Sequence, residues 1–519
     1  MSRYVIGGDV GSSGYKTVLL DIESGEIKAT ANIAYEVDWV KPNWAQQDPF
    51  LWKEAFVKAT KRLIEDSGIR DREVEGIAFS GQQHGAVVVD KENQPLHEAI
   101  LWCCQRSAKE CKDIEEAVAR ETAEKDAYVR EIGMHAMAGF QGPKVLWFYN
   151  HLPQVYKKIE QLLFPKDWLK TEISREKRWT TELSDLSGSG YLKLDGTVSE
   201  LVMRVMKLSH HWIPEVLPST SYVGAISEEV AEETGLSVDT KIFGGGGDNP
   251  CSMLGNNAYL LESVGTSGTF SVRARQPIVD ETLHPFVLPD DRFSHPQGPR
   301  QPLHCIIDAA SAIDYIAERV YGKGKFTYEM LNRVARRTPA GSHGKVVIPF
   351  IHGQRVPYAP QGRLYIKGYA PNKDEKEDLI RAAMEGVAYA MKYGFELLRE
   401  GMRKQEIVEA ERITITGGGA RGEEASQIRS DVYGKELINP HTEGAAVGAA
   451  YIAAAGLLDE SVEKVSARLF ERGIQVSPQK PTLIAPRGEN IKLYEEGYGR
   501  YLEVLEEAFK NGFEQEPLI

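Results

Sequence analysis

The sequence predicts an α/β protein built from two related domains. Predicted strands and helices alternate along most of the 519 residues, which is typical of layered α/β folds. A short turn of glycine, two hydroxyl residues and glycine occurs at residues 11–14 and again at residues 265–268. Each copy leaves an apolar run and enters a β-rich one, so each predicts a β-hairpin. Together they indicate a duplicated unit, with one copy in each domain.

The composition fits a globular protein and excludes several classes of partner. The net charge is −13, and Lys and Arg are scattered along the chain rather than clustered. Nucleic acid or an anionic membrane surface as a partner is therefore not expected. No run approaches the roughly 20 apolar residues of a membrane span. A secretory signal is not recognisable, and the five cysteines lack C-x-x-C spacing, so we expect a cytoplasmic protein with reduced thiols.

The elements can be assigned in order along the chain from the spacing of apolar residues. The first part contains consecutive strands over residues 4–35, a helix over 49–67, a strand ending at 79–80 and a charged helix over 107–126. The second part contains a long amphipathic helix over 378–402, a strand over 412–416, a helix over 423–432 and a small-residue helix over 445–455. Residues 275–302 are rich in proline and look irregular, and the tail after about residue 460 is expected to be helical.

The repeated turn offers the donors that a polyphosphate needs. Its tip exposes backbone N–H groups and hydroxyls, although a purely structural turn is the alternative. Asp9 closes the first strand directly before the turn. It either forms the turn or holds a hydrated Mg²⁺, which prefers one or two carboxylates together with phosphate oxygens. Lys16 lies just past the turn and either reaches a phosphate or remains solvated.

Two other glycine patterns resemble nucleotide-binding motifs. Residues 11–17 resemble a phosphate-binding loop, but Tyr15 separates the glycine from the lysine and a hairpin follows instead of a helix, which excludes it. Gly417, Gly419 and Gly422 match G-x-G-x-x-G between a strand and a helix. This match leaves a nicotinamide-dependent oxidoreductase as an alternative. The same glycines would also let adenine or adenosine approach the backbone.

Two further segments carry groups suited to catalysis and sugar binding. Four glycines at residues 244–247 precede Asp248, which either accepts a proton from an attacking hydroxyl or caps the helix that follows. Gln83 and His84 follow a strand and offer the donors and acceptors that bind sugar hydroxyls. Trp102 could stack on a sugar, and the alternative is a place in the core.

Taken together, these segments resemble the FGGY family of carbohydrate kinases, with the xylulokinases as the nearest branch. The resemblance spans roughly residues 4–455. The matching segments are residues 8–14, 47–49, 81–85, 99–102, 139–147, 165–169, 245–249, 264–268, 384–386 and 417–421. The order and spacing of these segments carry the assignment, because each one alone is modest.

The resemblance implies an α/β fold of two ribonuclease H-like, actin-like ATPase domains with an active-site cleft between them. The implied parts are an N-terminal sugar-binding domain (1–255), a C-terminal nucleotide-binding domain (256–460) and a helical extension that packs on the body (461–519). It also implies ATP and Mg²⁺, with Asp248 as the general base and Asp9 at the metal. The other implied site residues are Gln83, His84, Asn249 and Trp102 for the sugar, Ser12, Ser13, Lys16, Gly265 and Thr266 for the phosphates, and Gly418 and Gly419 for the nucleotide.

The implied reaction is phosphorylation of D-xylulose to D-xylulose 5-phosphate. Cys103 and Cys104 stand where xylulokinases commonly have Asn and Asp, and Gln83 stands where they usually have Met. These departures leave L-xylulose, ribulose, erythritol and glycerol open, with glycerol disfavoured because its kinases have Arg-Glu at the position of Gln83 and His84. A catalytically silent sensor of nucleotide and sugar is the alternative of another class. A homodimer is an open expectation for the assembly.

Overall fold

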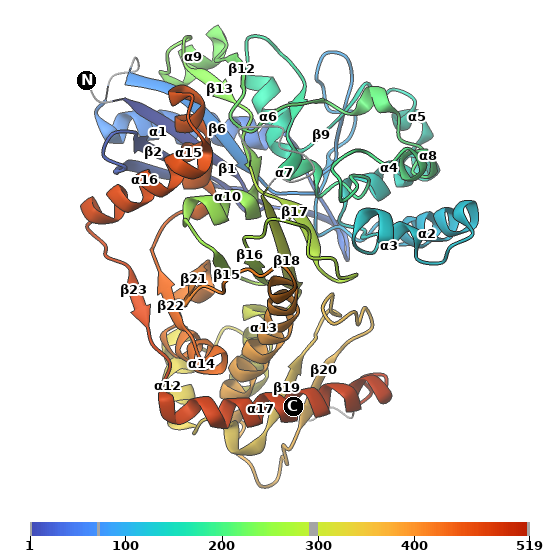
Figure 1. The fold of residues 1–519 in the computed structure, drawn as a ribbon, viewed down its shortest axis with the longest axis vertical. Helices are drawn as coiled ribbons and strands as arrows, with labels where there is room; N and C mark the ends of the chain where they lie inside the picture. Colours follow the sequence, from blue (N-terminus) through green and yellow to red (C-terminus); the bar gives the residue numbers. More distant parts are fainter. Residues whose placement is uncertain (1–2, 70–72, 290–298, 516–519) are drawn as a thin grey trace. The chain divides into compact units, whose positions relative to one another are not determined.

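The computed structural model describes residues 3–69, 73–289 and 299–515, and the chain forms two compact units (Figure 1). Unit 1 comprises residues 1–257, 275–301 and 442–479. Unit 2 comprises residues 258–274, 302–441 and 480–519. The chain therefore crosses between the units several times, and each unit contains segments that are distant in sequence.

Unit 1 is built on a mixed sheet with strand order β12-β13-β6-β1-β2-β3. β1 pairs antiparallel with β2 and parallel with β6, so the first repeated turn joins the two central hairpin strands. The strands are β1 (Tyr4–Val10), β2 (Gly14–Asp21), β3 (Ile27–Ala34), β6 (Val74–Gly81), β12 (Tyr222–Ala225) and β13 (Lys241–Phe243), and the short β14 (Gly246–Gly247) also pairs with β6.

Unit 2 repeats this plan, because the strands β18-β16-β15-β21-β22-β23 are successive neighbours in its sheet. Again a central hairpin, β15–β16, carries the repeated turn, and β15 pairs parallel with the next strand, β21. The strands are β15 (Leu260–Val264), β16 (Gly268–Val272), β18 (Arg300–Ile306), β21 (Arg412–Thr416), β22 (Glu436–Asn439) and β23 (Thr482–Ile484). The matching strand orders confirm the expected fold class of two related α/β domains.

Helix α15 (Gly444–Leu458) covers one face of the unit 1 sheet, against β1, β2 and β6 (Figure 1). The backbones approach closely, because a Cβ atom at Gly7 of β1 would lie 1.9 Å from the carbonyl oxygen of Ala446. Helix α10 (Asp248–Gly255) packs on α15 just as closely, and a Cβ atom at Gly448 would lie 1.9 Å from the Cys251 carbonyl oxygen. The small-residue composition of α15 thus lets α10 lie close to the sheet.

The remaining helices surround these sheets. In unit 1 they are α1 (Phe50–Ser67), α2 (Ala108–Thr122), α3 (Ala127–Ile132), α4 (Gln141–His151), α5 (Pro153–Tyr156), α6 (Pro165–Ile173), α7 (Leu183–Leu186), α8 (Glu200–Val205), α9 (Glu228–Thr234) and α16 (Val462–Val476). In unit 2 they are α11 (Ala310–Tyr321), α12 (Tyr328–Arg337), α13 (Asp378–Lys404), α14 (Glu423–Tyr433) and α17 (Gly488–Lys510).

Short strands complete the two units. The unit 1 pieces are β4 (Asp38–Lys41), β5 (Trp44–Gln47), β7 (Val87–Val89), β8 (Ala99–Ile100), β9 (Gln161–Leu163), β10 (Thr180–Thr181), β11 (Glu215–Val216) and β17 (His284–Val287). The unit 2 pieces are β19 (Val346–Pro349) and β20 (Leu364–Lys367).

Most elements expected from the sequence are present within one to three residues of their predicted bounds. One exception is the helix predicted over 107–126, which ends four residues early as α2 (Ala108–Thr122) and is followed by a separate helix, α3 (Ala127–Ile132). The others lie in the irregular and C-terminal segments. Residues 275–302 include strand β17 and the start of β18, while part of this segment lies outside the described residues. The tail after residue 460 contains the strand β23 between its two helices, and β23 pairs with β22. The tail is therefore helical as expected over α16 (Val462–Val476) and α17 (Gly488–Lys510), and β23 is a short strand that the sequence did not indicate.

The compact units do not follow the domain limits expected from the sequence, 1–255, 256–460 and 461–519. Helix α16 belongs to unit 1, whereas β23 and α17 belong to unit 2. The compact units bring together segments that contact one another in space. The expected domain limits, in contrast, are positions along the sequence, so the two divisions need not coincide. Those limits stay a prediction.

Among the described residues, no single helix is both long and apolar enough to cross a membrane. The pair α15 and α16, bent by 119° at their junction, meets the criteria of length and composition only when the two helices are taken together.

The close packing of α10 on α15 predicts that Gly448→Ala destabilises unit 1. Its new methyl group would collide with the Cys251 carbonyl and push the helices apart, and overpacking of this kind costs about 1–3 kcal/mol. Thermal unfolding should show a lower Tm for this variant. Gly499→Ala in α17 is the matched control, because among the described residues no atom apart from its chain neighbours and the adjacent backbone of α17 lies within 4 Å of its new methyl group. A control that loses as much stability as Gly448→Ala would contradict the packing argument.

Candidate active site

Asp248 begins helix α10 at the edge of the unit 1 sheet. The helix is capped by the backbone of Gly247, so Asp248 is the first helical residue rather than the cap itself. Its Oδ1 accepts a hydrogen bond from the Asn249 backbone N–H at 2.8 Å and another from Asn249 Nδ2 at 3.1 Å. The residue is half-buried, and its carboxylate is therefore both oriented by the protein and accessible.

Burial raises the pKa of Asp248 to about 7, and the negative charge of Asp9 adds to the rise. Burial also raises the pKa of Asp9, although Asp9 Oδ1 accepts a hydrogen bond from Ser80 Oγ at 2.9 Å. Two neighbouring carboxyl groups thus resist ionisation. A carboxyl group with a pKa near 7 can both accept and release a proton at neutral pH.

The pair of carboxyl groups, Asp9 and Asp248, fits a magnesium ion that takes most of its ligands from water and from the phosphate groups of a bound substrate. Among the described residues, no three His, Cys, Asp or Glu side chains are grouped to form a metal cage. Mg²⁺ needs no such cage, because one or two carboxylates, water and phosphate oxygens suffice. A cation beside Asp9 would also relieve the repulsion between the Asp9 and Asp248 carboxylates. The donor set present in unit 1 therefore fits Mg²⁺ at Asp9.

Two of the four glycines before Asp248, Gly245 and Gly247, are required by close packing against β6 and the residues that follow it. Gly245 has φ of +86°, and a Cβ atom there would lie 2.1 Å from the Phe79 carbonyl oxygen. A Cβ atom at Gly247 would lie 2.7 Å from the side chain of Gln83. The glycine run therefore brings the backbone before Asp248 directly against the strand end that carries Gln83.

Gln83 and His84 are both nearly buried at the end of β6. Gln83 Oε1 accepts a hydrogen bond from Asn249 Nδ2 at 3.4 Å, so the amides of two predicted sugar-binding residues meet. His84 adopts φ of +70°, and its Nδ1 lies 2.8 Å from the Gly188 carbonyl oxygen. Because a carbonyl oxygen only accepts, Nδ1 carries a proton in this contact. The His84 ring lies among three aromatic rings, those of Phe140, His284 and Phe286.

The first repeated turn is tied to the same region through Trp102. Trp102 Nε1 donates to Ser12 Oγ at 2.8 Å, and Ser12 Oγ donates to Gln82 Oε1 at 3.1 Å. Ser13 is exposed at the tip, while Lys16 is exposed and forms an ion pair with Glu443 at 3.0 Å. The structure thus brings Trp102 and Ser12 together, and leaves Ser13 and Lys16 at the surface of unit 1.

In unit 2 the second turn lies at the start of helix α11. The carbonyl oxygen of Thr266 accepts hydrogen bonds from Ala309 N at 2.9 Å and Ser311 Oγ at 2.9 Å, while the residue itself is exposed. The carbonyl oxygen of Gly265 accepts from Ala310 N at 3.1 Å. The turn is therefore fixed by its carbonyl groups, which leaves the Thr266 side chain at the surface.

Gly418 and Gly419 occupy the turn between β21 and α14, as predicted. Gly417 precedes them with φ of +85°, and a Cβ atom at Gly419 would lie 2.5 Å from Val264 Cγ1. Among the described residues, no atom lies within 4 Å of a Cβ atom at Gly418, which is exposed. A Cβ atom at Gly417 or Gly419 would meet Val264 of β15, whereas one at Gly418 would face open space, and Gly417 and Gly418 are both exposed.

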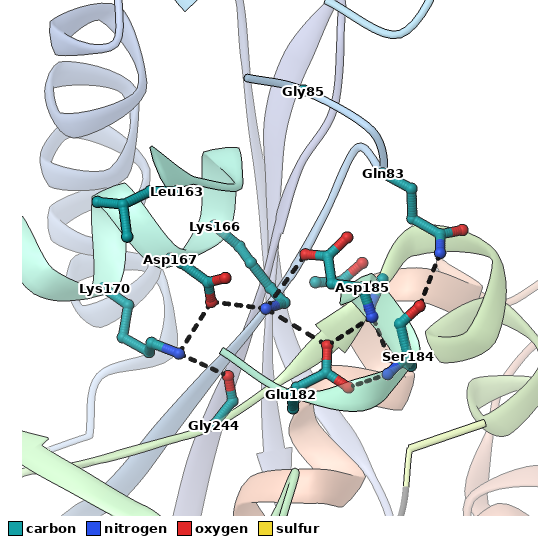
Figure 2. A network of polar contacts seen from close by, with 12 residues as sticks. Gln83, Gly85, Leu163, Lys166, Asp167, Lys170, Glu182, Ser184, Asp185 and Gly244 are labelled. Atoms are coloured by element: carbon teal, nitrogen blue, oxygen red, sulfur yellow. Dashed lines mark hydrogen bonds and ion pairs between the residues drawn. The ribbon is translucent and has the colours of Figure 1, made fainter. Parts of the chain in front are cut away.

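Sequence reasoning missed a buried network of charged residues beneath Gln83 (Figure 2). Lys166 Nζ lies 2.6 Å from Asp167 Oδ1, 3.2 Å from Asp185 Oδ2 and 3.4 Å from Glu182 Oε1. Lys170 Nζ contacts Asp167 Oδ1 at 2.9 Å and donates to the Gly244 carbonyl oxygen at 3.1 Å. The sequence signals for it are residues 165–169, one of the segments that resemble the family, and the charged residues interspersed among apolar ones in α6, all of whose residues are buried.

The charges of this network can balance if Asp185 is protonated. Burial raises the pKa of Asp185 well above its usual value, and the neighbouring carboxylates add to the rise. Burial opposes the charge of Lys166, but neighbouring carboxylates, that of Asp167 first, raise its pKa overall. A neutral Asp185 leaves Lys166 and Lys170 facing Asp167 and Glu182, which is two positive against two negative charges. Buried charges are retained only when they are paired in this way.

Family models match nearly the whole chain. The N-terminal domain of the FGGY family of carbohydrate kinases matches residues 4–255, and the C-terminal domain of the same family matches residues 260–457. The chain therefore belongs to the FGGY family of carbohydrate kinases. It is an enzyme that transfers a phosphoryl group from ATP to a sugar hydroxyl, as the resemblance implied.

Two relatives extend this likeness over most of their own length. The chain is 28% identical to a xylulose kinase of Lactococcus lactis over 521 residues, which covers 98% of this chain and 97% of the relative. It is 29% identical to a xylulose kinase of Escherichia coli over 488 residues, which covers 92% and 93%.

Solved structures agree on the fold. A xyloylose kinase from Brucella ovis matches with a TM-score of 0.84 at 24% identity, over 97% of this chain and 98% of that one. A gluconate kinase from Lactobacillus acidophilus matches with a TM-score of 0.85 at 20% identity, over 98% of both chains. Because kinases named for different substrates match equally well, the fold alone does not identify the sugar. The roles of individual residues, Mg²⁺, a cytoplasmic location and a homodimer stay predictions.

The raised pKa of Asp248 predicts a pH-dependent gain in stability for Asp248→Asn. The folded-state pKa of about 7 lies above the unfolded value of about 3.9, so the cost of ionising Asp248 is absent below about pH 4 and complete above pH 7. In metal-free buffer with EDTA, the variant should therefore gain more in Tm over wild type at pH 8 than at pH 5.

Asp239→Asn, at an exposed loop carboxylate, controls for the loss of one negative charge. The argument fails if the advantage of Asp248→Asn is the same at both pH values, or if Asp239→Asn produces an equal pH-dependent gain.

Proposed function

We propose that this carbohydrate kinase phosphorylates D-xylulose to D-xylulose 5-phosphate, with Asp248 as the general base. The observation that carries the mechanism is the Asp248 carboxyl group with its pKa of about 7, held beside the amides of Gln83 and Asn249. The likeness to two xylulose kinases over nearly their full length supports the choice of sugar.

Asp248 acts on the hydroxyl group that attacks the γ-phosphate of ATP. As the bond from the sugar oxygen to phosphorus forms and the bond to the leaving ADP oxygen breaks, the carboxylate accepts the hydroxyl proton. Its two hydrogen bonds from Asn249 fix the orientation of Oδ1 in α10. An oriented base contributes chiefly through positioning, because phosphoryl transfer requires little other covalent chemistry from the protein.

The proposed sugar-binding residues are Gln83, His84, Asn249 and Trp102. Gln83 and Asn249 already share a hydrogen bond, so a sugar hydroxyl can bridge the same donors and acceptors. Trp102 is half-buried and is anchored by Ser12, which favours a wall of the sugar site over a place in the core. Another tryptophan of unit 1, Trp52 in α1, is fully buried and belongs to the core.

The phosphates of ATP are assigned to the two repeated turns and to Mg²⁺. Ser13 and Lys16 are exposed in unit 1, and Lys16 would exchange Glu443 for a phosphate oxygen. Ser12 would contribute through its backbone, because its hydroxyl group already binds Trp102 and Gln82. Asp9 would hold Mg²⁺, which when bound neutralises charge on the phosphates.

Gly265 and Thr266 would contact the phosphates from unit 2. Gly418 and Gly419 would line the base and ribose of the nucleotide, with Gly418 offering the open backbone.

The identity of the sugar depends on the segment after Trp102. Cys104 Sγ lies 3.0 Å from Arg106 Nε, and Arg106 also donates to Gln46 Oε1 at 2.9 Å. The buried guanidinium group therefore contacts a thiol where xylulokinases commonly provide a carboxylate. This difference favours testing other ketopentoses and polyols beside D-xylulose.

A sugar panel tests the proposed substrate. ADP release with Mg-ATP should be fastest, measured as kcat/KM, with D-xylulose among D-xylulose, L-xylulose, ribulose, gluconate, erythritol and glycerol. A higher kcat/KM for any other member would replace D-xylulose while leaving the kinase assignment intact. No release with any sugar would favour the sensor alternative.

Asp248→Ala tests the proposed base. The variant should lose at least about 10²-fold in kcat, because a general base contributes about 10²–10⁴-fold, while still binding Mg-ATP. ATP binding is measured by calorimetry or by the rise in Tm with Mg-ATP. Turnover within a few-fold of wild type would overturn the assignment of Asp248.

A further inference from the structure

Five residues of unit 1 form a closed ring of contacts around Asp248. The Gly247 N–H donates to Ser184 Oγ at 3.0 Å, and Gln83 Nε2 donates to the Ser184 carbonyl oxygen at 3.0 Å. Asn249 Nδ2 lies 3.4 Å from Gln83 Oε1 and 3.1 Å from Asp248 Oδ1. The peptide bond between Gly247 and Asp248 closes the ring.

Within this ring, Ser184 binds both the backbone that precedes Asp248 and the side chain of Gln83. Its hydroxyl group fixes the peptide just before Asp248, and its carbonyl group fixes the amide of Gln83. It is fully buried, whereas Asp248 and Asn249 are half-buried. Ser184 is therefore not exposed at the accessible face of the site, and its contacts within the ring are with Gly247 and Gln83. Any effect that it has on the reaction is transmitted through Gly247 and Gln83.

Glu182 fixes Ser184 in turn, through the first turn of α7. Its Oε2 accepts from the Ser184 backbone N–H at 2.6 Å, and its Oε1 accepts from the Asp185 backbone N–H at 2.9 Å. Glu182 Oε1 also lies 3.4 Å from Lys166 Nζ (Figure 2). The serine is therefore held on a short helix that is anchored to the buried charge network.

The same network also holds the other end of the glycine run. Lys170 Nζ donates to the Gly244 carbonyl oxygen, and Figure 2 shows this contact beside the contacts of Lys166. The backbone N–H of Gly245 donates to the Ser219 carbonyl oxygen at 3.0 Å. The four glycines are thus tied at Gly244, Gly245 and Gly247, which explains how so flexible a sequence can hold a catalytic group in place.

We propose that Ser184 is a positioning residue for the phosphoryl transfer, which sets Asp248 and Gln83 relative to each other through its hydroxyl and carbonyl groups. This inference rests on the proposed role of Asp248 as the base. The hydroxyl contact governs the placement of the base, and the carbonyl contact governs the sugar-binding amide. Loss of the hydroxyl group alone should therefore affect the chemical step more than sugar binding.

Ser184→Ala removes the acceptor for Gly247 and leaves the carbonyl contact to Gln83. We expect kcat to fall about 10–100-fold while the KM for the sugar changes less than about 3-fold, because small displacements of a catalytic group can cost up to about 10²-fold in rate. Ser189→Ala is the matched control. Ser189 is also fully buried in the same segment, but its hydroxyl accepts from the Tyr191 N–H, outside the ring. This control should retain wild-type kcat.

A double-mutant cycle separates positioning from a general loss of structure. Ser184→Ala added to Asp248→Ala should cause no further loss of the residual rate, because the base that it positions is already gone. A merely structural effect would instead lower the residual rate by the same factor as in wild type. If Ser184→Ala does not fold, Ser184→Cys replaces it, since a thiol is a weaker acceptor of similar size, and an intermediate loss of kcat is expected.

The inference is overturned by wild-type kcat in Ser184→Ala, by an equal loss in Ser189→Ala, or by full additivity in the cycle. These outcomes differ from failure of the proposed function. In that case Asp248→Ala itself would keep its turnover, whatever Ser184→Ala does.

Discussion

The close packing of Gly245 and Gly247, within a run of four glycines, against the end of β6 and Gln83 is the constraint on which the site in unit 1 depends. Because no side chain separates them, the backbone at Gly245 and Gly247 lies against Phe79 and Gln83. Helix α10 therefore begins at a fixed point, with Asp248 as its first residue. The close contact between Gly448 and Cys251 then holds α10 on α15. Base, sugar-binding amide and helix are thus positioned by one packing arrangement.

The electrostatics of the site oppose its stability and serve its chemistry. Burial raises the pKa of both Asp9 and Asp248, so two carboxyl groups are held where ionisation is unfavourable. Such a cost is typical of functional sites, where perturbed pKa values concentrate. A base with a pKa of about 7 is well matched to proton transfer at neutral pH. The buried network below ties the short helix α7 and the glycine run to Lys166 and Lys170 of α6.

The sequence was sufficient to predict the two-domain α/β fold, the repeated hairpins and the family. Local patterns carry these features: the glycine-bracketed turns and the helices over 378–402 and 445–455. The pairing of β23 with β22 and the support of Asp248 by Ser184 were not predictable. They depend on contacts between segments more than 40 residues apart, and Ser184 stands in no motif that indicates a role. From the sequence alone, the charged residues of α6 indicate a solvent-exposed helix face. In the structure α6 is fully buried, and Lys166 contacts Glu182 and Asp185.

The central claim is that Asp248 accepts the proton of the attacking sugar hydroxyl. A crystal structure with D-xylulose, Mg²⁺ and a non-hydrolysable ATP analogue tests it most directly. The account predicts that an Asp248 carboxylate oxygen lies within about 2.6–3.2 Å of the hydroxyl oxygen that faces the γ-phosphate, directly or through one water. A sugar bound with that hydroxyl group against another base, and with Asp248 out of reach, would contradict it.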